Sequence, residues 1–183
     1  MEDKTMLEVT SKPKVSIVIP TQHRIHLLPE IIDCFNQQTW WNKELLILDD
    51  TPNGKEAIEE LQKQYPNIHL WHINEICSIG SKRNQLIQKA SGELIAHFDD
   101  DDYYAPTYIE TLAKAIINSN ADLLKLSAWF CLHEASKTLG YWDTTRTDLP
   151  HTAFGGNEKP AAHHQTFTRE QYKSFLTGYG FSY

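Results

Sequence analysis

Short apolar runs and amphipathic stretches alternate along the first two thirds of the chain. The apolar runs are rich in Ile, Val and Leu, which is typical of strands that are buried on both faces of a sheet. They cover residues 14–20, 44–50, 68–73 and 94–98. The pattern therefore predicts four strands.

Between these runs, apolar residues recur at helical spacing. The first stripe consists of Leu27, Leu28, Ile31, Ile32 and Phe35. It predicts a helix that ends near residue 38. A turn at residues 51–54 leads to a second predicted helix that ends near residue 65, and Pro106 opens another that ends near residue 118.

A further helix is predicted over residues 82–90, with Ser81 as its N-cap and Gly92 at its end. Strands and helices thus alternate at the spacing of βαβ units with right-handed crossovers. The sequence predicts an α/β fold, with a mostly parallel sheet and helices on both of its faces.

The pattern changes after residue 121. An apolar run at 122–132, turn residues at 135–140 and a segment at 141–146 that can pair back antiparallel predict a smaller mixed or antiparallel part. Residues 147–162 have little periodicity, as in a lid or binding loop. A short strand at 163–168 and a helical turn at 169–175 are expected to follow.

Composition and charge narrow the function classes. The chain has 183 residues, 40% of them hydrophobic, and a formal net charge of -7, so no basic field favours nucleic acid. No run approaches the roughly 20 apolar residues of a membrane span, which leaves only peripheral membrane association open. Residues 1–14 resemble neither a signal peptide nor an anchor. Nothing indicates the oligomeric state.

Cysteine usage indicates the compartment. Cys34, Cys77 and Cys131 are scattered and lack Cys-x-x-Cys spacing. This argues against a disulfide framework and a structural zinc site. A reducing, cytoplasmic setting fits best.

Four consecutive aspartates, Asp99, Asp100, Asp101 and Asp102, follow the apolar run at 94–98. We refer to them as the acid cluster. Adjacent anions repel one another, and a divalent cation offsets that repulsion well. Asp99 and Asp101 can face one side and share a hard cation, with Asp100 turned toward a neighbouring ligand. The alternative is a solvated acidic loop.

Other polar residues are expected at the same edge of the sheet. Thr21 follows Pro20 at the end of the first strand, and the second strand ends at Asp49 and Asp50. Ligands bind beyond the carboxyl ends of open parallel sheets. Asp49 and Asp50 have the alternative of capping the turn before the next helix.

Cations are expected beside this edge as well. Lys82, Arg83 and Asn84 open a predicted helix, where backbone N–H groups favour a phosphate. For Arg83 the alternative is a solvent-facing side chain. Carboxylates and cations together predict a site for a nucleoside diphosphate and a metal ion, which would make the diphosphate a better leaving group.

Three aromatic positions are interpreted as structural. Trp40 and Trp41 follow an apolar helix, and His97 lies inside a predicted strand. Although a Trp can stack on a sugar, aromatic residues in such places are more often core or interface residues. We interpret Trp40 and Trp41 as core or interface residues, and we expect His97 to pack.

The order of these motifs resembles the nucleotide-binding half of family 2 glycosyltransferases, which are inverting enzymes of the GT-A fold. The resemblance covers residues 14 to about 117. It rests on Val-Ser-Ile-Val-Ile-Pro-Thr-x-x-Arg at 15–24, Leu-Asp-Asp at 48–50, Ser-Lys-Arg-Asn at 81–84, and Gly-Glu at 92–93 leading to Phe-Asp-Asp-Asp-Asp at 98–102. It implies a nucleotide-sugar donor, often a UDP-sugar, with Mn²⁺ or Mg²⁺. The acceptor would be the hydroxyl group of a glycan or another molecule.

The resemblance also implies roles for single residues. The nucleobase of the donor would lie against Pro20, Thr21 and Asp50, with Arg83 near the nucleobase or the diphosphate. Asp100 would lie at the ribose, and Asp101 would bind the metal with support from Asp99. The implied donor-binding set is Pro20, Thr21, Arg24, Asp50, Arg83, Asp99 and Asp100.

The chain departs from the family pattern in three places. Gln22 and His23 replace the usual aromatic residue and Asn, and Thr51-Pro52 replaces the common Gly-Ser. The chain also stops before the acidic motif that supplies the family's catalytic base. The base therefore stays unassigned, and its candidates are Glu158, His163 and His164.

These features lead us to expect a flexible tail at 1–13 and one domain at 14–183. In that domain, 14–118 would bind the donor, and 119–183 would be an apparently truncated acceptor side. Two alternatives to a metal-dependent glycosyltransferase stay open. One is a nucleotide-sugar-binding module without a base. The other is a sugar nucleotidyltransferase, although the Gly-rich phosphate loop expected for one does not follow the first strand.

Overall fold

The computed structural model describes residues 12–133 and 138–143. The chain divides into two compact units, Met1–Asp122 and Leu123–Tyr183. Within the described ranges, no helix has the length and apolar character needed to cross a lipid bilayer.

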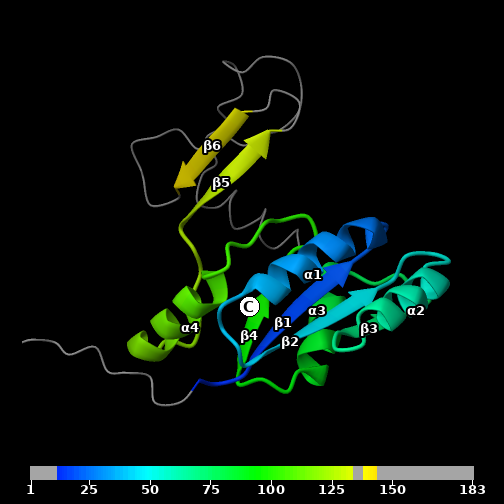
Figure 1. Ribbon diagram of the computed structural model, residues 1–183, viewed down its shortest axis with the longest axis horizontal. Helices are drawn as coiled ribbons and strands as arrows, with labels where there is room; N and C mark the ends of the chain where they lie inside the picture. Colours follow the sequence, from blue (N-terminus) through cyan, green and yellow to red (C-terminus); the bar gives the residue numbers. More distant parts are fainter. Residues whose placement is uncertain (1–11, 134–137, 144–183) are drawn as a thin grey trace, which may run out of the picture. The chain divides into compact units, whose positions relative to one another are not determined.

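The first unit is built on a four-stranded parallel sheet. Its strands are β1 (Val15–Thr21), β2 (Lys43–Asp49), β3 (His69–His72) and β4 (Leu94–His97). They are ordered β3-β2-β1-β4, and every neighbouring pair is parallel (Figure 1). All four were predicted to within one residue at each end, and the mostly parallel α/β fold is confirmed.

Four α-helices cover the two faces of this sheet. They are α1 (Leu28–Gln37), which follows the 3-10 helix η1 (Ile25–Leu27), then α2 (Lys55–Gln64), α3 (Ile79–Lys89) and α4 (Tyr108–Ser119). Residues of α1, α2 and α4 share one core with the sheet, and Leu86 of α3 packs with the other face. The chain moves across the sheet from β1 through β2 to β3 and then returns past β1 to β4. Because crossovers between parallel strands are right-handed, this reversal puts α3 on the face of the sheet opposite α1 (Figure 1).

The core forms where the apolar runs predicted it. Every residue of β1 is buried, and the helical stripe of α1 buries Leu28, Ile31, Ile32 and Phe35. Trp40 is fully buried and donates its indole N–H to the carbonyl of Pro13 at 3.1 Å. Trp41 is 69% exposed, so it is not a core residue of this unit. A core position is confirmed for Trp40, and an interface role stays a prediction for Trp41.

Helix α3 begins earlier than the sequence pattern indicated. Ser78, in an extended conformation, is the N-cap and accepts the backbone N–H of Ser81 through its hydroxyl at 3.1 Å. The N–H of Lys82 already bonds to the Ser78 carbonyl at 3.0 Å. Ser81 is thus not the N-cap, and Lys82 and Arg83 lie beyond the first turn, so their own N–H groups do not form an anion site.

Gly92 does not end α3, because the helix stops at Lys89 and Ala90 is its extended C-cap. Gly92 instead crosses closely over β1, and its N–H donates to the hydroxyl of Ser16 at 2.8 Å. A Cβ atom at Gly92 would lie 2.6 Å from the carbonyl oxygen of Lys14. The glycine is therefore required by this close approach rather than by a helix end.

A buried carboxylate ties the amino ends of β1 and β2 to the turn before β4. Glu44 pairs with Lys14 at 2.7 Å and accepts the hydroxyl groups of Ser16 at 2.5 Å and Ser91 at 2.9 Å. Burial opposes ionisation, but these hydrogen bonds outweigh it and lower the pKa of Glu44 to about 2. We call these four residues the Glu44 cluster.

The described part of the second unit is an antiparallel hairpin of β5 (Ala128–His133) and β6 (Thr138–Asp143), with Ala128 opposite Asp143. The predicted antiparallel pairing is confirmed. Strand β6 begins inside the turn expected at 135–140, so the connection is shorter than predicted. The loop, strand and helical turn predicted after residue 146 lie outside the described residues.

Candidate functional site

Three strand ends meet at the carboxyl edge of the sheet. Thr21 ends β1, Asp49 ends the neighbouring β2, and β4, on the other side of β1, leads into the acid cluster. The strand order reverses direction between β1 and β4, and open α/β sheets bind ligands at such a switch point. The expected convergence of Thr21, Asp49, Asp50 and the acid cluster is therefore present.

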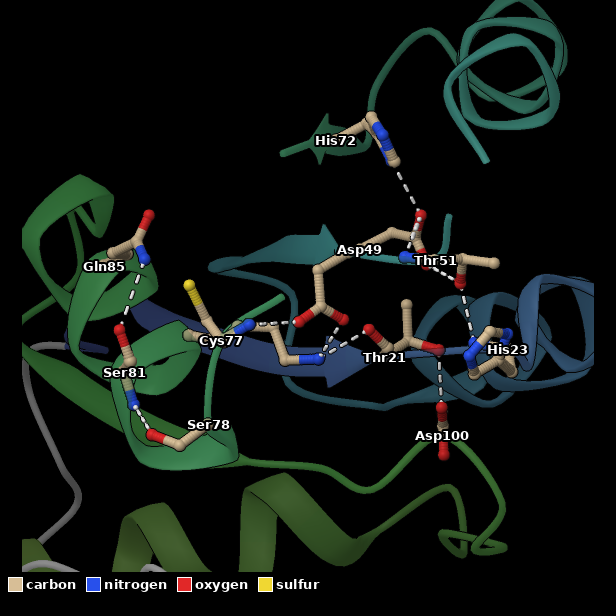
Figure 2. Close-up of polar contacts among 12 residues, drawn as sticks. Thr21, His23, Asp49, Thr51, His72, Cys77, Ser78, Ser81, Gln85 and Asp100 are labelled. Carbon is tan, nitrogen blue, oxygen red and sulfur yellow. Dashed lines mark hydrogen bonds and ion pairs between the residues drawn. The ribbon is translucent and has the colours of Figure 1, made fainter. Parts of the chain in front are cut away.

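Asp100 is the inward-facing member of the acid cluster. It is 7% exposed, and its Oδ2 accepts the hydroxyl of Thr21 at 2.5 Å (Figure 2). By contrast, the side chains of Asp99 and Asp101 are 50% and 48% exposed. Asp100 is thus the buried member between two exposed neighbours, and a cation shared by Asp99 and Asp101 stays a prediction.

Arg24 bridges two carboxylates of the cluster. Its Nη1 donates to Asp100 Oδ1 at 2.9 Å and to Asp101 Oδ2 at 2.8 Å. The hydrogen bond to Asp100 and the charges of the aspartates raise the pKa of Arg24. His23, at a positive φ of 58°, turns the backbone there, and its N–H donates to Thr51 Oγ1 at 2.6 Å. The left-handed turn thus positions Arg24.

Arg83 reaches the acid cluster from α3, on the opposite face of the sheet from α1. It is 8% exposed, and its Nη2 donates to Asp99 Oδ1 at 2.8 Å. The solvent-facing alternative is therefore wrong for Arg83. Its position depends on the placement of α3 rather than on a first helical turn.

The cluster keeps an excess of negative charge, since two guanidinium groups face four carboxylates. Desolvation and the charges of Asp99, Asp101 and Asp100 raise the pKa of Asp102. Desolvation is the largest cause of this rise, and repulsion from the neighbouring carboxylates adds to it. A divalent cation bound here would relieve that repulsion.

Tyr104 holds the loop that carries the cluster. Its ring stacks on Phe98 with centroids 3.6 Å apart, and its hydroxyl accepts the backbone N–H of Asp99 at 2.8 Å. Burial raises the pKa of Tyr104, so the hydroxyl stays neutral. Gln38, just after α1, donates to the carbonyl of Ala105 at 2.9 Å. Neither anchor was predicted from the sequence, although the paired tyrosines behind the aspartates were a signal for Tyr104.

Asp50 is fully buried and both of its carboxylate oxygens have protein donors. Lys82 Nζ donates to Oδ1 at 2.6 Å, and the backbone N–H of Cys77 donates to Oδ2 at 2.8 Å. Lys82 also donates to the carbonyl of Thr21 at 2.8 Å. No motif in the sequence predicted this pairing. A contact between Asp50 and a base stays a prediction.

Asp49 serves as a turn cap. Its carboxylate accepts the N–H of Thr51 at 3.1 Å and the Thr51 hydroxyl at 2.5 Å, and it lies 2.9 Å from His72 Nδ1 (Figure 2). The capping alternative is therefore right for Asp49.

The residues present fit a hard cation that takes few protein ligands. In the part of the chain that the structure covers, no three His, Cys, Asp or Glu side chains are grouped so that they could hold a metal ion. Asp99 and Asp101 can each offer carboxylate oxygens, and ions such as Mg²⁺ commonly use one or two carboxylates together with phosphate oxygens and water. A bound diphosphate would thus have to complete the site.

The remaining candidates are placed differently. Pro20 is buried in β1, next to Thr21. Glu158, His163 and His164 lie outside the described residues. His97 was expected to pack, but its side chain is exposed at the edge strand β4. Partial desolvation and the charge of Arg83 lower the pKa of His97.

Comparisons with known proteins agree with this geometry. The family model described as Glycosyl transferase family 2 matches residues 16–175. Over 143 residues, the chain is 29% identical to a curated protein of Escherichia coli (strain K12) described as "Uncharacterized glycosyltransferase YibD". The match covers 76% of this chain and 40% of YibD, so the chain spans about two fifths of that relative.

Two solved structures share the fold. The mannosyltransferase PcManGT from Pyrobaculum calidifontis, in complex with GDP-Man and Mn²⁺, matches with a TM-score of 0.50 over 65% of this chain and 35% of its own. S. aureus TarS 1-349, in complex with UDP, matches with a TM-score of 0.52 over 60% of this chain and 33% of its own. Both are 22% identical to this chain, and at this identity the likeness shows a shared fold only.

Proposed function

The chain belongs to glycosyl transferase family 2, and from this premise we propose that it takes part in sugar transfer from a nucleotide-sugar donor to an acceptor hydroxyl. The donor is a UDP-sugar, and the acceptor is a glycan or another hydroxyl compound. A Mn²⁺ or Mg²⁺ ion assists the reaction.

One observation carries this proposal. Two half-exposed carboxylates, on Asp99 and Asp101, lie at the switch point of a parallel sheet, and the guanidinium groups of Arg83 and Arg24 lie within 2.8 Å of them. Carboxylates bind a hard cation, and guanidinium groups bind phosphate oxygens. Metal–diphosphate recognition needs both kinds of group together.

The residues would divide the work by position. Asp101 is the main protein ligand of the cation, with support from Asp99. The bound ion acts as a Lewis acid that neutralises the departing diphosphate. Arg83, anchored from α3, and Arg24, from the end of β1, contact diphosphate oxygens. Asp100, fixed by Thr21, orients the loop toward the ribose.

The identity of the donor's nucleobase is less constrained by the structure than the presence of a diphosphate. PcManGT was solved with GDP-Man and TarS with UDP, so proteins of this fold are found with different bases. The proposed preference for uracil rests on Asp50, since a carboxylate can accept the imide N–H of uracil but finds no such donor on neutral cytosine. In this structure Cys77 N–H holds one oxygen of Asp50, so the loop before α3 must yield to a base.

Calorimetric titration of UDP, CDP and GDP into the 183-residue chain, with and without Mn²⁺, tests the proposal. UDP should bind best and only weakly without the ion. Asp101→Asn should abolish the Mn²⁺-dependent part, whereas Asp33→Asn, which alters an exposed carboxylate on α1, should not. Unchanged UDP affinity in Asp101→Asn with Mn²⁺ present would contradict the metal assignment. Equal binding of UDP and CDP would contradict the uracil assignment.

A general base that takes the acceptor proton contributes roughly 10² to 10⁴ in rate. The candidates for this role are still Glu158, His163 and His164. Transfer assays on Glu158→Gln and His164→Ala address it. The true base should lose turnover while its donor affinity is kept. If both variants transfer sugar at the rate of the unaltered chain, neither residue is the base.

A further inference from the structure

Arg24 binds the acid cluster in the manner of a small cation. A single nitrogen, Nη1, lies 2.9 Å from an oxygen of Asp100 and 2.8 Å from an oxygen of Asp101. One positive centre shared by carboxylates of two residues is also the arrangement that a divalent ion would adopt. Arg24 and a metal ion would therefore compete for the Asp101 carboxylate, which the proposed function assigns to the ion.

The two arginines of the site differ in how firmly they are held. Arg83 is 8% exposed, and its partner Asp99 is fixed by the Tyr104 hydroxyl at the backbone. The side chain of Arg24 is 49% exposed, and its two partners differ: Asp101 is 48% exposed, whereas Asp100 is 6% exposed. Exposed ion pairs are weak because water competes with both partners. A ligand can thus displace Arg24 from Asp101, its exposed partner.

Displacement would leave the surrounding structure in place. Asp100 keeps its hydrogen bond from Thr21 when Arg24 leaves. The backbone of Arg24 is fixed independently, because its carbonyl accepts the N–H of Leu27 at 2.9 Å and His23 is tied to Thr51. Only the Arg24 side chain has to rotate, and its length allows it to reach a diphosphate beside the cluster.

We propose that Arg24 exchanges with the divalent ion: its guanidinium group holds Asp100 and Asp101 until metal and diphosphate bind, and then moves from Asp101 to the diphosphate. The proposal rests on the proposed function. When no nucleotide is present, Arg24 competes with the ion for Asp101 and weakens ion binding. When ion and nucleotide bind together, Arg24 contacts the diphosphate and strengthens nucleotide binding. A static ion pair would not produce these opposite effects.

The test measures two affinities in Arg24→Gln, each by calorimetry on the full chain. Without nucleotide, Mn²⁺ should bind roughly threefold to tenfold more tightly than to the unaltered chain, since the Arg24 charge no longer competes for the half-exposed Asp101 carboxylate. With saturating Mn²⁺, UDP should bind about tenfold more weakly, because the diphosphate loses a charge-assisted contact. Arg24→Lys should fall between, and Lys63→Gln, which removes an exposed cation on α2, should change neither affinity.

Each outcome decides the proposal. Affinities that move in opposite directions in Arg24→Gln support the exchange. A Mn²⁺ affinity that is unchanged or weaker in Arg24→Gln overturns the exchange, and so does a loss of both affinities. Circular dichroism, together with the Arg24→Lys variant, identifies a folding defect. If the unaltered chain binds Mn²⁺ and UDP but Arg24→Gln behaves like it, only the exchange fails. If the unaltered chain binds neither, the proposed function fails too.

Discussion

The buried ion pair of Lys82 and Asp50 offers the sharpest test of the site's architecture. Their side chains are 3% and 0% exposed, and Lys82 Nζ lies 2.6 Å from Asp50 Oδ1. In Lys82→Met, a chain of similar length stays in the pocket while the positive charge is removed. Asp50 then keeps only the Cys77 N–H as a donor, and the Thr21 carbonyl loses Lys82.

The expected loss is large. Removing one partner of a buried pair leaves an uncompensated buried charge and typically costs about 3–5 kcal/mol. Domains have only about 5–15 kcal/mol of unfolding free energy in all, so the variant should be marginally folded. With a urea m value of about 2 kcal/mol/M, the midpoint should fall by about 2 M.

Urea unfolding followed by circular dichroism measures this loss. The double variant Lys82→Met/Asp50→Asn removes both charges and keeps an acceptor for Cys77, so it should be more stable than Lys82→Met alone, with a coupling of about 1–3 kcal/mol. Lys63→Met, which breaks an exposed pair with Glu60, should change stability by about 0.5 kcal/mol or less. A Lys82→Met effect below about 1 kcal/mol, or strictly additive effects in the double variant, would refute the reasoning.

Three further changes follow from the same contacts. The Glu44 carboxyl has a pKa of about 2 in the fold against an ordinary value of 4.5, so its stabilisation is present above pH 4.5 and is lost as the pH falls toward 2. In Glu44→Gln the urea midpoint should change less with pH across this window, and an unaltered pH profile would disprove the assignment. Gly92→Ala places a Cβ 2.6 Å from the Ser16 hydroxyl and should cost about 1–3 kcal/mol in urea unfolding, so a neutral result would show that β1 can shift. Tyr104→Phe leaves the Asp99 N–H without its acceptor and should lower the free energy of unfolding by about 1–3 kcal/mol. It should also weaken Mn²⁺-dependent UDP binding, and full UDP affinity would show that this hydrogen bond does not position the acid cluster.

The two central strands, β1 and β2, were predictable because they are buried on both faces of the sheet. Such strands read as continuous apolar runs, and turn residues mark where they end. The start of α3 was not predictable in this way. Its first turn contains Ile79, which is 47% exposed, and Gly80, so no apolar stripe marks it. The sequence predicted Ser81 as the cap, and only the backbone conformation identifies Ser78.

The location of the site followed from topology, but its pairings did not. Parallel strands place their carboxyl ends at one edge, so the convergence of Thr21, Asp50 and the acid cluster could be expected from the order of strands and helices. The bond between Lys82 and Asp50 joins residues 32 positions apart, from α3 and the end of β2. It depends on the angle and depth at which α3 packs, which hydrophobic periodicity does not specify.

Thr21 explains how two halves of the site are kept in register. Its carbonyl accepts Lys82 at 2.8 Å and its hydroxyl donates to Asp100 at 2.5 Å, so one residue contacts both the Asp50 pair and the acid cluster. Every residue of β1 is buried, so Thr21 cannot shift without disturbing the core on both faces of the sheet. A displacement of Asp50 or Lys82 is therefore transmitted to Asp100. The proposed base-binding side and the proposed metal-binding side are held at a fixed separation by the end of one strand, as a donor whose base and diphosphate are covalently linked requires.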